Sequence, residues 1–212
     1  MAGSSIDLSY AQGKANAILQ AWYPGALGGI AIADTLFGKC SPQGKLPITF
    51  YRSLENLPDF TDYSMKGRTY RFLTEKPLYP FGYGLTYGDI EIDHVENMGF
   101  DRNKSLCLKV NLSNQGTVET GDVVQVYIKN CDSVFAVKNP CLCAFQVIQL
   151  APGEKMQIDI SIPQDSFMVI DEKGQRILDG DMYEIFVDTK QPDARSQELI
   201  KSKPWMLKVR HN

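Results

Sequence analysis

One carboxylate stands out as a candidate for acid/base chemistry. Asp34 lies within the apolar stretch "IAIADTLFG", where removal from water would raise the pKa of a carboxyl group enough for a general acid. Acid/base cleavage of a bond between sugars also needs a second carboxyl group, roughly 5 to 10 Å away. The sequence indicates no such partner, so we favour the alternative that Asp34 accepts hydrogen bonds from backbone amides and orders its loop.

A second group of residues has the chemistry to bind a ligand. The stretch "DFTDYSMKGRTYRFL" alternates carboxylate and guanidinium groups with aromatic rings. Rings stack on the apolar faces of sugars, and Asp and Arg side chains bond to hydroxyl groups. The candidate substrate-binding residues are Asp62, Tyr63, Arg68, Tyr70 and Arg71. The alternative, which is the commoner role of rings between domains, is that they pack against a neighbouring domain.

Other kinds of site lack support in the sequence. His94 and His211 are far apart, and no serine lies in a G-x-S-x-G motif. Cys131, Cys141 and Cys143 lack the paired spacing typical of zinc ligands. No glycine-rich motif for binding phosphate is present. We therefore predict no catalytic residue, no metal ion and no cofactor on this chain.

Composition limits the partners and the compartment. The 22 basic and 25 acidic residues give a net charge of −3 without runs of like charge, which argues against nucleic acid and anionic membranes as partners. No apolar run approaches the roughly 20 residues that span a bilayer. The first residues, "MAGSSIDLSYAQGK", do not resemble a secretory signal. Five cysteines without dense spacing favour a reducing compartment, so we expect a cytoplasmic location.

Residues 1–50 have the pattern of an α/β layer. In "YAQGKANAILQAWYPG", apolar residues at helical spacing predict a helix that ends before Pro24. A second helix is predicted from Gly29 to Gly38, "KLPITFY" as a short strand, and "SSIDLS" as a possible strand end. The apolar faces of both helices would pack against a sheet whose other strands are absent. We therefore expect exposed apolar surface formed by Ile18, Leu19, Trp22, Leu36 and Phe37. Such a surface predicts association of the chain or partial disorder of residues 1–50.

The rest of the chain separates into a connector and a β-rich domain. Residues 51–89 are rich in aromatic residues, proline and glycine and have no sustained period, which indicates an ordered connector between domains. From residue 90 to 212, short alternating strands with turns between them indicate an immunoglobulin-like or fibronectin-like sandwich with almost no helix. The predicted strands are "SLCLKVNLS", "DVVQVYIK", "LCAFQVIQL", "KMQIDISIP" and "DMYEIFVD", with a type II turn in "LAPGEK".

The motifs "AWYPG", "IADTLFG", "DYSMKGRTYRF", "YPFGYGL" and "LAPGEK", in this order, closely resemble the C-terminal part of glycoside hydrolase family 3. The family includes β-glucosidases and β-xylosidases, and "DYSMKGRTYRF" is most similar to the xylosidase or arabinofuranosidase side. The resemblance implies a mainly β chain in which a fibronectin type III-like domain, residues 90–212, follows a fragment of an α/β sandwich domain, residues 1–50.

The resemblance also implies that the catalytic groups lie elsewhere. Family members carry their aspartate nucleophile on an N-terminal barrel and their acid/base glutamate well before the "AWYPG" motif, so no catalytic residue is transferred to this chain. The implied reaction is retaining hydrolysis of O-glycosyl bonds, and the isolated chain is expected to be inactive. Three hypotheses follow: the non-catalytic part of a glycosidase, a carbohydrate-binding or scaffolding module, and half of a split enzyme that needs a barrel-bearing partner chain or associates with itself.

Overall fold

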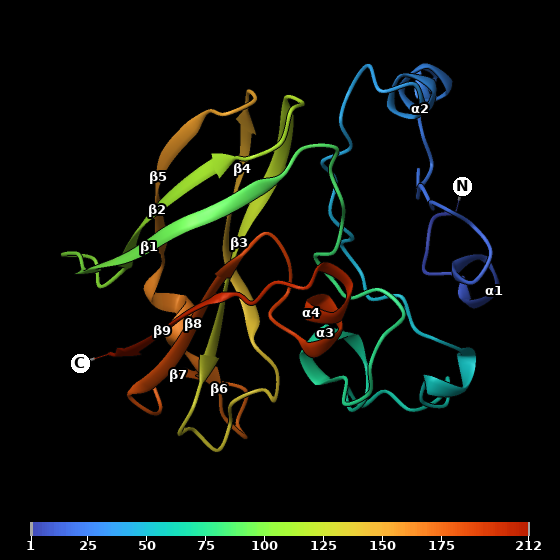
Figure 1. Ribbon diagram of the computed structural model, residues 1–212. Coiled ribbons are helices and arrows are strands. Elements are labelled where there is room, and N and C mark those ends of the chain that lie inside the picture. Colours follow the sequence, from blue (N-terminus) through green and yellow to red (C-terminus); the bar gives the residue numbers. More distant parts are fainter. Residues whose placement is uncertain (1, 212) are drawn as a thin grey trace.

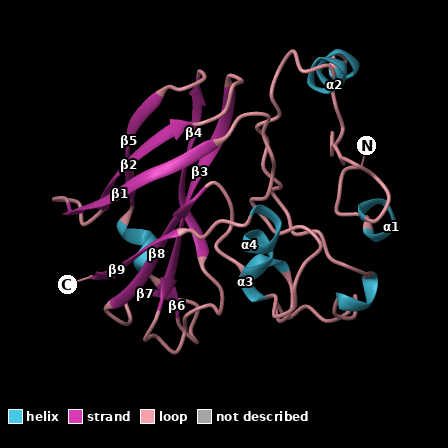
Figure 2. Ribbon diagram, viewed as in Figure 1, coloured by secondary structure: helices cyan, strands magenta, loops and turns pink. Residues whose placement is uncertain are grey.

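The computed structural model describes residues 2–211 and places a β-sandwich beside a largely irregular N-terminal segment (Figures 1 and 2). One sheet has the order β1-β2-β5 and the other β4-β3-β8-β9, with all neighbouring strands antiparallel. The strands are β1 (Ile90–Phe100), β2 (Leu106–Asn114), β3 (Thr120–Asn130), β4 (Cys141–Leu150), β5 (Lys155–Ile162), β8 (Met182–Asp188) and β9 (Trp205–Arg210), with a small pair β6 (Val169–Ile170) and β7 (Arg176–Ile177). The helices are α1 (Ser9–Gln12), α2 (Gly28–Leu36), α3 (Thr69–Phe72) and α4 (Ala194–Ile200), with single turns η1 (Leu54–Asn56) and η2 (Gln164–Phe167).

Alternating apolar residues form the core between the two sheets. On β2 the leucines at 106, 108 and 112 are buried, and Leu108 lies opposite Ile160 of β5. The intervening residues face outward, because successive side chains of a strand point to opposite faces. The predicted sandwich is therefore confirmed. The turn in "LAPGEK" also has the expected form, since Gly153 has a φ of 74° and the amide of Glu154 bonds to the carbonyl of Ala151.

The five predicted strands do not include β1, β6, β7 or β9, and α4 was not predicted either. The expectation of almost no helix missed α4, which begins after Asp193, where a carboxylate oxygen accepts a hydrogen bond from the amide of Ser196 at 2.5 Å. The sequence prediction also missed β9, whose indole at Trp205 donates to the carbonyl of Ile92 at 2.9 Å across the sandwich. Helix α4 and strand β9 are both short, so their patterns contain too few residues to be distinguished from loops.

The N-terminal predictions were partly wrong. The second helix is present as α2, but the first is reduced to α1, and "SSIDLS" and "KLPITFY" form no strand beyond a single bridge between Phe50 and Tyr79. A helix in water gains most of its stability by packing an apolar face, and a strand needs a neighbour for its backbone hydrogen bonds. Among the described residues, no sheet gives residues 2–40 an apolar surface to pack against or a neighbouring strand to pair with. The local sequence pattern alone therefore did not produce the first helix or the strands.

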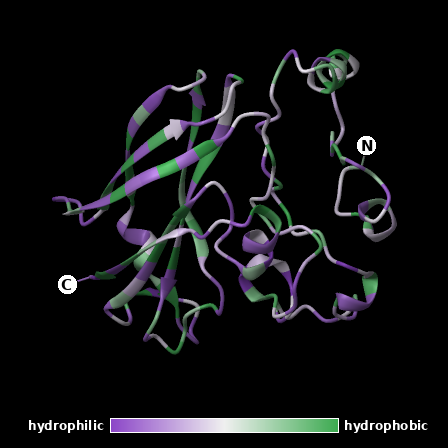
Figure 3. Cartoon of the chain, in the orientation of Figure 1, coloured by the Kyte–Doolittle hydropathy of each residue, from purple (hydrophilic) through white to green (hydrophobic). Residues whose placement is uncertain are grey.

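Helix α2 lies apart from the sandwich and contains many hydrophobic residues (Figure 3). Ile30, Leu36 and Phe37 have exposed fractions of 60%, 65% and 84%. Replacing all three by Ser should strongly reduce the fluorescence of a dye that binds apolar surface. Val134, on a loop of the sandwich, is 86% exposed. Because it is one isolated apolar residue, the control variant Val134→Ser should leave dye binding unchanged. Equal dye binding by the triple variant and the parent would contradict the prediction.

We expect a buried histidine to make the stability of the sandwich depend on pH. His211 lies 5.0 Å from Phe100 and 4.9 Å from Phe167, measured between ring centroids, and its Nε2 atom has no hydrogen-bond partner. Burial, with a smaller contribution from Lys104, lowers its pKa from 6.5. The unfolded chain therefore binds the proton more readily, and stability should fall as the pH drops below about 6.5.

The measurement is the free energy of unfolding at several pH values between about 5 and 8. His211→Phe removes the titrating group and keeps a ring among the neighbouring rings, so its stability should fall less steeply toward acid pH than that of the parent. Parallel curves for the two proteins would show that His211 is not responsible.

No helix in the described part of the chain combines the length and the apolar character that crossing a membrane would require.

Candidate functional site

Four of the five predicted substrate-binding residues have structural roles in the connector. Arg68 organises the loop that precedes it, because its Nη2 atom donates to the carbonyls of Asp59 and Asp62 at 2.9 and 2.7 Å. The carboxylate of Asp62 accepts a hydrogen bond from the amide of Ser64 at 2.8 Å, and this bond is the main cause of its lowered pKa. These bonds fix a closed loop over residues 59–68, which we call the connector loop.

Tyr70 and Arg71 attach the segment that follows the connector loop to the sandwich. The Tyr70 ring stacks on Phe81 with centroids 4.2 Å apart, and its hydroxyl oxygen accepts from the amide of Leu142 at 3.1 Å. Burial raises the pKa of Tyr70, so it remains a neutral phenol. The Nε atom of Arg71 donates to the sulfur of Cys141 at 3.3 Å. Both residues therefore contact β4 or the connector, and their role in binding substrate stays a prediction.

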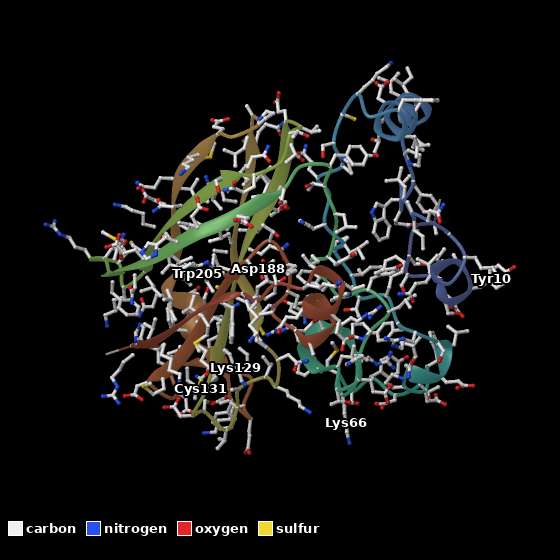
Figure 4. All side chains as sticks on the ribbon, viewed as in Figure 1. Tyr10, Lys66, Lys129, Cys131, Asp188 and Trp205 are labelled. Carbon is white, nitrogen blue, oxygen red and sulfur yellow. The ribbon has the colours of Figure 1, made fainter. Side chains whose placement is uncertain are left out.

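Among the predicted residues, Tyr63 presents an aromatic ring to solvent. Its side chain is 90% exposed, and the neighbouring Phe60, which was not among the predicted residues, is 91% exposed. Lys66, on the same loop, points into solvent (Figure 4). The loop therefore presents two rings on an ordered backbone, which reduces the conformational entropy that binding would cost. No sequence signal distinguished these rings from the packed ring of Tyr70, because all three lie in the same aromatic stretch.

Two segments of the sandwich that sequence reasoning missed hold the connector. The side-chain amide of Asn139 donates to the carbonyls of Tyr70 and Leu73 at 2.8 and 2.7 Å. From α4, Arg195 donates to the carbonyl of Leu78 at 3.2 Å, and Glu198 pairs with Lys76. Lys76, Asn139 and Arg195 border a cleft of about 300 Å³ between the connector and the sandwich. The polar groups of Asn139 and Arg195 already bond to the connector. We therefore interpret the cleft as the place where the connector packs against the sandwich.

The remaining candidates do not form a reactive centre. Asp34 pairs with Lys39 at 2.9 Å near the end of α2, so an ion pair occupies the carboxylate that had been considered as a general acid. The thiol of Cys143 is buried, which raises its pKa to about 12 and makes it a poor nucleophile. Within residues 2–211, no three His, Cys, Asp or Glu side chains are grouped so as to hold a metal ion.

Two family models match the chain in succession. Residues 1–87 match the glycosyl hydrolase family 3 C-terminal domain, and residues 122–191 match the fibronectin type III-like domain. The first match ends where the connector meets β1, and the second lies within the sandwich. The boundaries predicted at residues 50 and 89 remain predictions.

Curated relatives are similar along most of the chain. A xylan 1,4-beta-xylosidase of Xylanibacter ruminicola is 36% identical over 200 residues, which cover 93% of this chain and 23% of the relative. A periplasmic beta-glucosidase of Salmonella typhimurium is 31% identical over 216 residues, which cover 94% of this chain and 28% of the relative. The chain thus spans about a quarter of the length of the curated relatives it matches.

Solved structures have the same arrangement of elements. The beta-glucosidase of Bifidobacterium adolescentis superposes with a TM-score of 0.84 and 25% identity, over 98% of this chain and 32% of that one. The beta-glucosidase of Listeria innocua, in complex with gluconolactone, superposes with a TM-score of 0.78 and 22% identity, over 99% and 30%. The fold, including the irregular N-terminal segment, therefore recurs within much longer chains.

Proposed function

Because the chain belongs to the C-terminal part of glycoside hydrolase family 3, we propose that it serves as the C-terminal region of a β-glycosidase that hydrolyses O-glycosyl bonds. The two family matches in succession, with a relative named as a β-xylosidase that is similar over 93% of the chain, are the observation that carries the proposal. The substrate would be a β-xyloside or a β-glucoside, and the enzyme would act in carbohydrate metabolism.

The proposed mechanism places the reacting groups outside these 212 residues. Retaining hydrolysis uses one carboxylate as the nucleophile and a second carboxyl group as the acid, about 5 Å apart on either side of the bond. In this proposal both groups come from the barrel and from the earlier part of the α/β domain. The exposed apolar residues of α2 would pack against that part, and the sandwich would hold the connector loop in a fixed position beside it.

A chimera tests this function. The C-terminal quarter of the Xylanibacter ruminicola relative is replaced by this chain, and release of nitrophenol from aryl β-xyloside and aryl β-glucoside is measured. We expect activity from the chimera and none from the 212-residue chain alone or from the relative without its C-terminal quarter. A folded but inactive chimera would count against the proposal, and release of sugar by the pure 212-residue chain would contradict the location of the catalytic groups.

The exposed rings support a second candidate function, in which the chain binds oligosaccharides without cleaving them. Tyr63 would stack on the sugar, and Asp62, Arg68, Tyr70 and Arg71 would hold the loop in position. Calorimetric titration with xylo- and gluco-oligosaccharides should show binding that Tyr63→Ser abolishes. Leu54→Ser, which replaces another residue that is 79% exposed near the loop, should bind normally. Absence of binding by the parent chain would contradict this second function, and the role as part of a β-glycosidase would be the remaining candidate.

We also propose a reducing, cytoplasmic location. The support is the state of the cysteines, since all five are unpaired and Cys40 and Cys131 are exposed. In an oxidising compartment exposed thiols usually pair or become oxidised. Fractionation of the source cells with an antibody against this chain should find it with cytoplasmic markers, and recovery with an exported fraction would overturn the proposal.

A further inference from the structure

The four strands at the edges of the two large sheets differ in whether they carry charged residues. The edges are β1 and β5 in one sheet and β4 and β9 in the other. Three of them carry charges, which discourage pairing with strands of other molecules. The charged residues are Glu91, Asp93 and Glu96 on β1, Lys155 and Asp159 on β5, and Lys208 and Arg210 on β9. β4, "CLCAFQVIQL", has ten residues and neither a charge nor a proline.

Two of the outward side chains of β4 are also apolar. Phe145 and Val147 have exposed fractions of 64% and 61%, whereas Ile148 and Leu150 point into the core. The strand pairs only with β3, and the hydroxyl of Tyr70 bonds to the amide of Leu142 at its beginning. From Cys143 onward, no strand of the described chain pairs with the other side of β4. A long, uncharged edge with apolar side chains is a site at which another strand is expected to add.

We propose that a second copy of this chain pairs with β4, antiparallel and about a two-fold axis, so that two four-stranded sheets become one continuous sheet. In an antiparallel pair, residues directly opposite each other share a face. A two-fold register centred on Gln146 sets it opposite the partner's Gln146. Phe145 then lies opposite the partner's Val147, and symmetry repeats this contact of a ring with a β-branched side chain.

The chemistry of the strand selects a second copy over an unrelated protein. β4 carries no charge that would choose a partner of opposite sign, whereas its two outward apolar residues complement each other when the strand meets itself. Pairing of β4 with another edge of the sandwich would bring charged residues of β1, β5 or β9 against an apolar strand. Such pairing costs desolvation of the charges.

Hydrogen exchange at two protein concentrations tests this dimer. Within residues 143–149, we expect the backbone amides that point away from β3 to exchange about tenfold more slowly at about 100 µM than at about 1 µM, because pairing protects them and depends on mass action. Val147→Lys should abolish this concentration dependence. Met206→Lys places the same charge on the other edge strand of the same sheet, at a residue that is 47% exposed, and should leave the dependence unchanged. Phe145→Lys provides a second disrupting variant if Val147→Lys fails to fold.

Exchange at this strand separates the dimer from other kinds of association. Contact between copies through α2 would change the exchange of residues 28–36 and leave β4 unaffected, and that result would overturn the proposal. Concentration-independent exchange at residues 143–149 would overturn it as well. Protection that appears only when the N-terminal part of a family 3 relative is added would instead assign β4 to a contact with that part. Hydrogen exchange at β4 can therefore contradict the dimer, whereas the activity of the chimera tests the proposed hydrolytic function separately.

Discussion

Replacing Asp122 by Ala should lower the free energy of unfolding by about 3 to 5 kcal/mol, the usual cost of leaving a buried charge without its partner. Asp122 on β3 pairs with Lys45 at 2.6 Å, and the side chains are 7% and 10% exposed. Burial raises the pKa of the Asp122 carboxyl, and the ammonium of Lys45 opposes that shift. In the variant, Lys45 would keep its hydrogen bond to the carbonyl of Gly84 but lose its counter-charge.

Denaturant unfolding of two further proteins would separate the effect of burial from that of charge. Lys45→Met combined with Asp122→Leu replaces the pair by apolar side chains, and its stability should return close to that of the parent, as is common for buried ion pairs. Arg210 and Asp181 form an exposed pair at 3.2 Å, so Arg210→Gln should cost no more than about 1 kcal/mol. A cost for Asp122→Ala as small as that for Arg210→Gln would show that water reaches the Lys45 pair.

Gly82→Ala should lower the free energy of unfolding by about 2 to 4 kcal/mol through backbone strain and overlap acting together. Gly82 has a φ of 73°, which side chains other than glycine's rarely adopt. An added Cβ atom would lie 2.6 Å from the hydroxyl oxygen of Tyr127 and closer still to the amide oxygen of Gln125. Tyr127 and Gln125 belong to β3, so the substitution would push the connector away from the sheet.

Gly153→Ala isolates the backbone contribution. Gly153 has a φ of 74°, and an added Cβ atom would meet no atom within 4 Å. Its cost should therefore be about 1 kcal/mol, and the difference between the two variants reports the overlap with β3. Equal costs measured by denaturant unfolding would mean that the connector can shift away from Gln125 without loss of stability.

The same contact covers the outer face of β3, where Gln125 and Tyr127 are buried. The side chain of Gln125 donates to the carbonyls of Gly82 and Thr189, both at 2.9 Å, and accepts from the hydroxyl of Tyr127 at 2.6 Å. Residues 76–89 therefore form part of the sandwich's structure, which explains why a connector contains so many rings and glycines. The glycines permit close approach to β3, and rings such as Phe81 pack beside it.

The amino-acid sequence by itself determined the sandwich, its main strands and the family. Alternation in β2 and β5 is a local signal, because each strand has one side in the core and one in water. The motifs "IADTLFG" and "YPFGYGL" carried the family resemblance without any knowledge of contacts. Helix α2 was predictable from local signals as well, since it ends at Leu36, shortly before Gly38, whose φ of 73° is typical of the residue that follows a helix.

Only the tertiary structure decided which residues of the aromatic connector are free and which are packed. Tyr63 and Tyr70 are the same residue type in the same stretch, yet Tyr63 is exposed and Tyr70 stacks on Phe81 and bonds to β4. The helix expected around Ile18 likewise failed to form, because a helical pattern becomes a helix mainly where a partner surface buries its apolar face. Both outcomes depend on contacts between residues far apart in the chain, which local spacing does not encode.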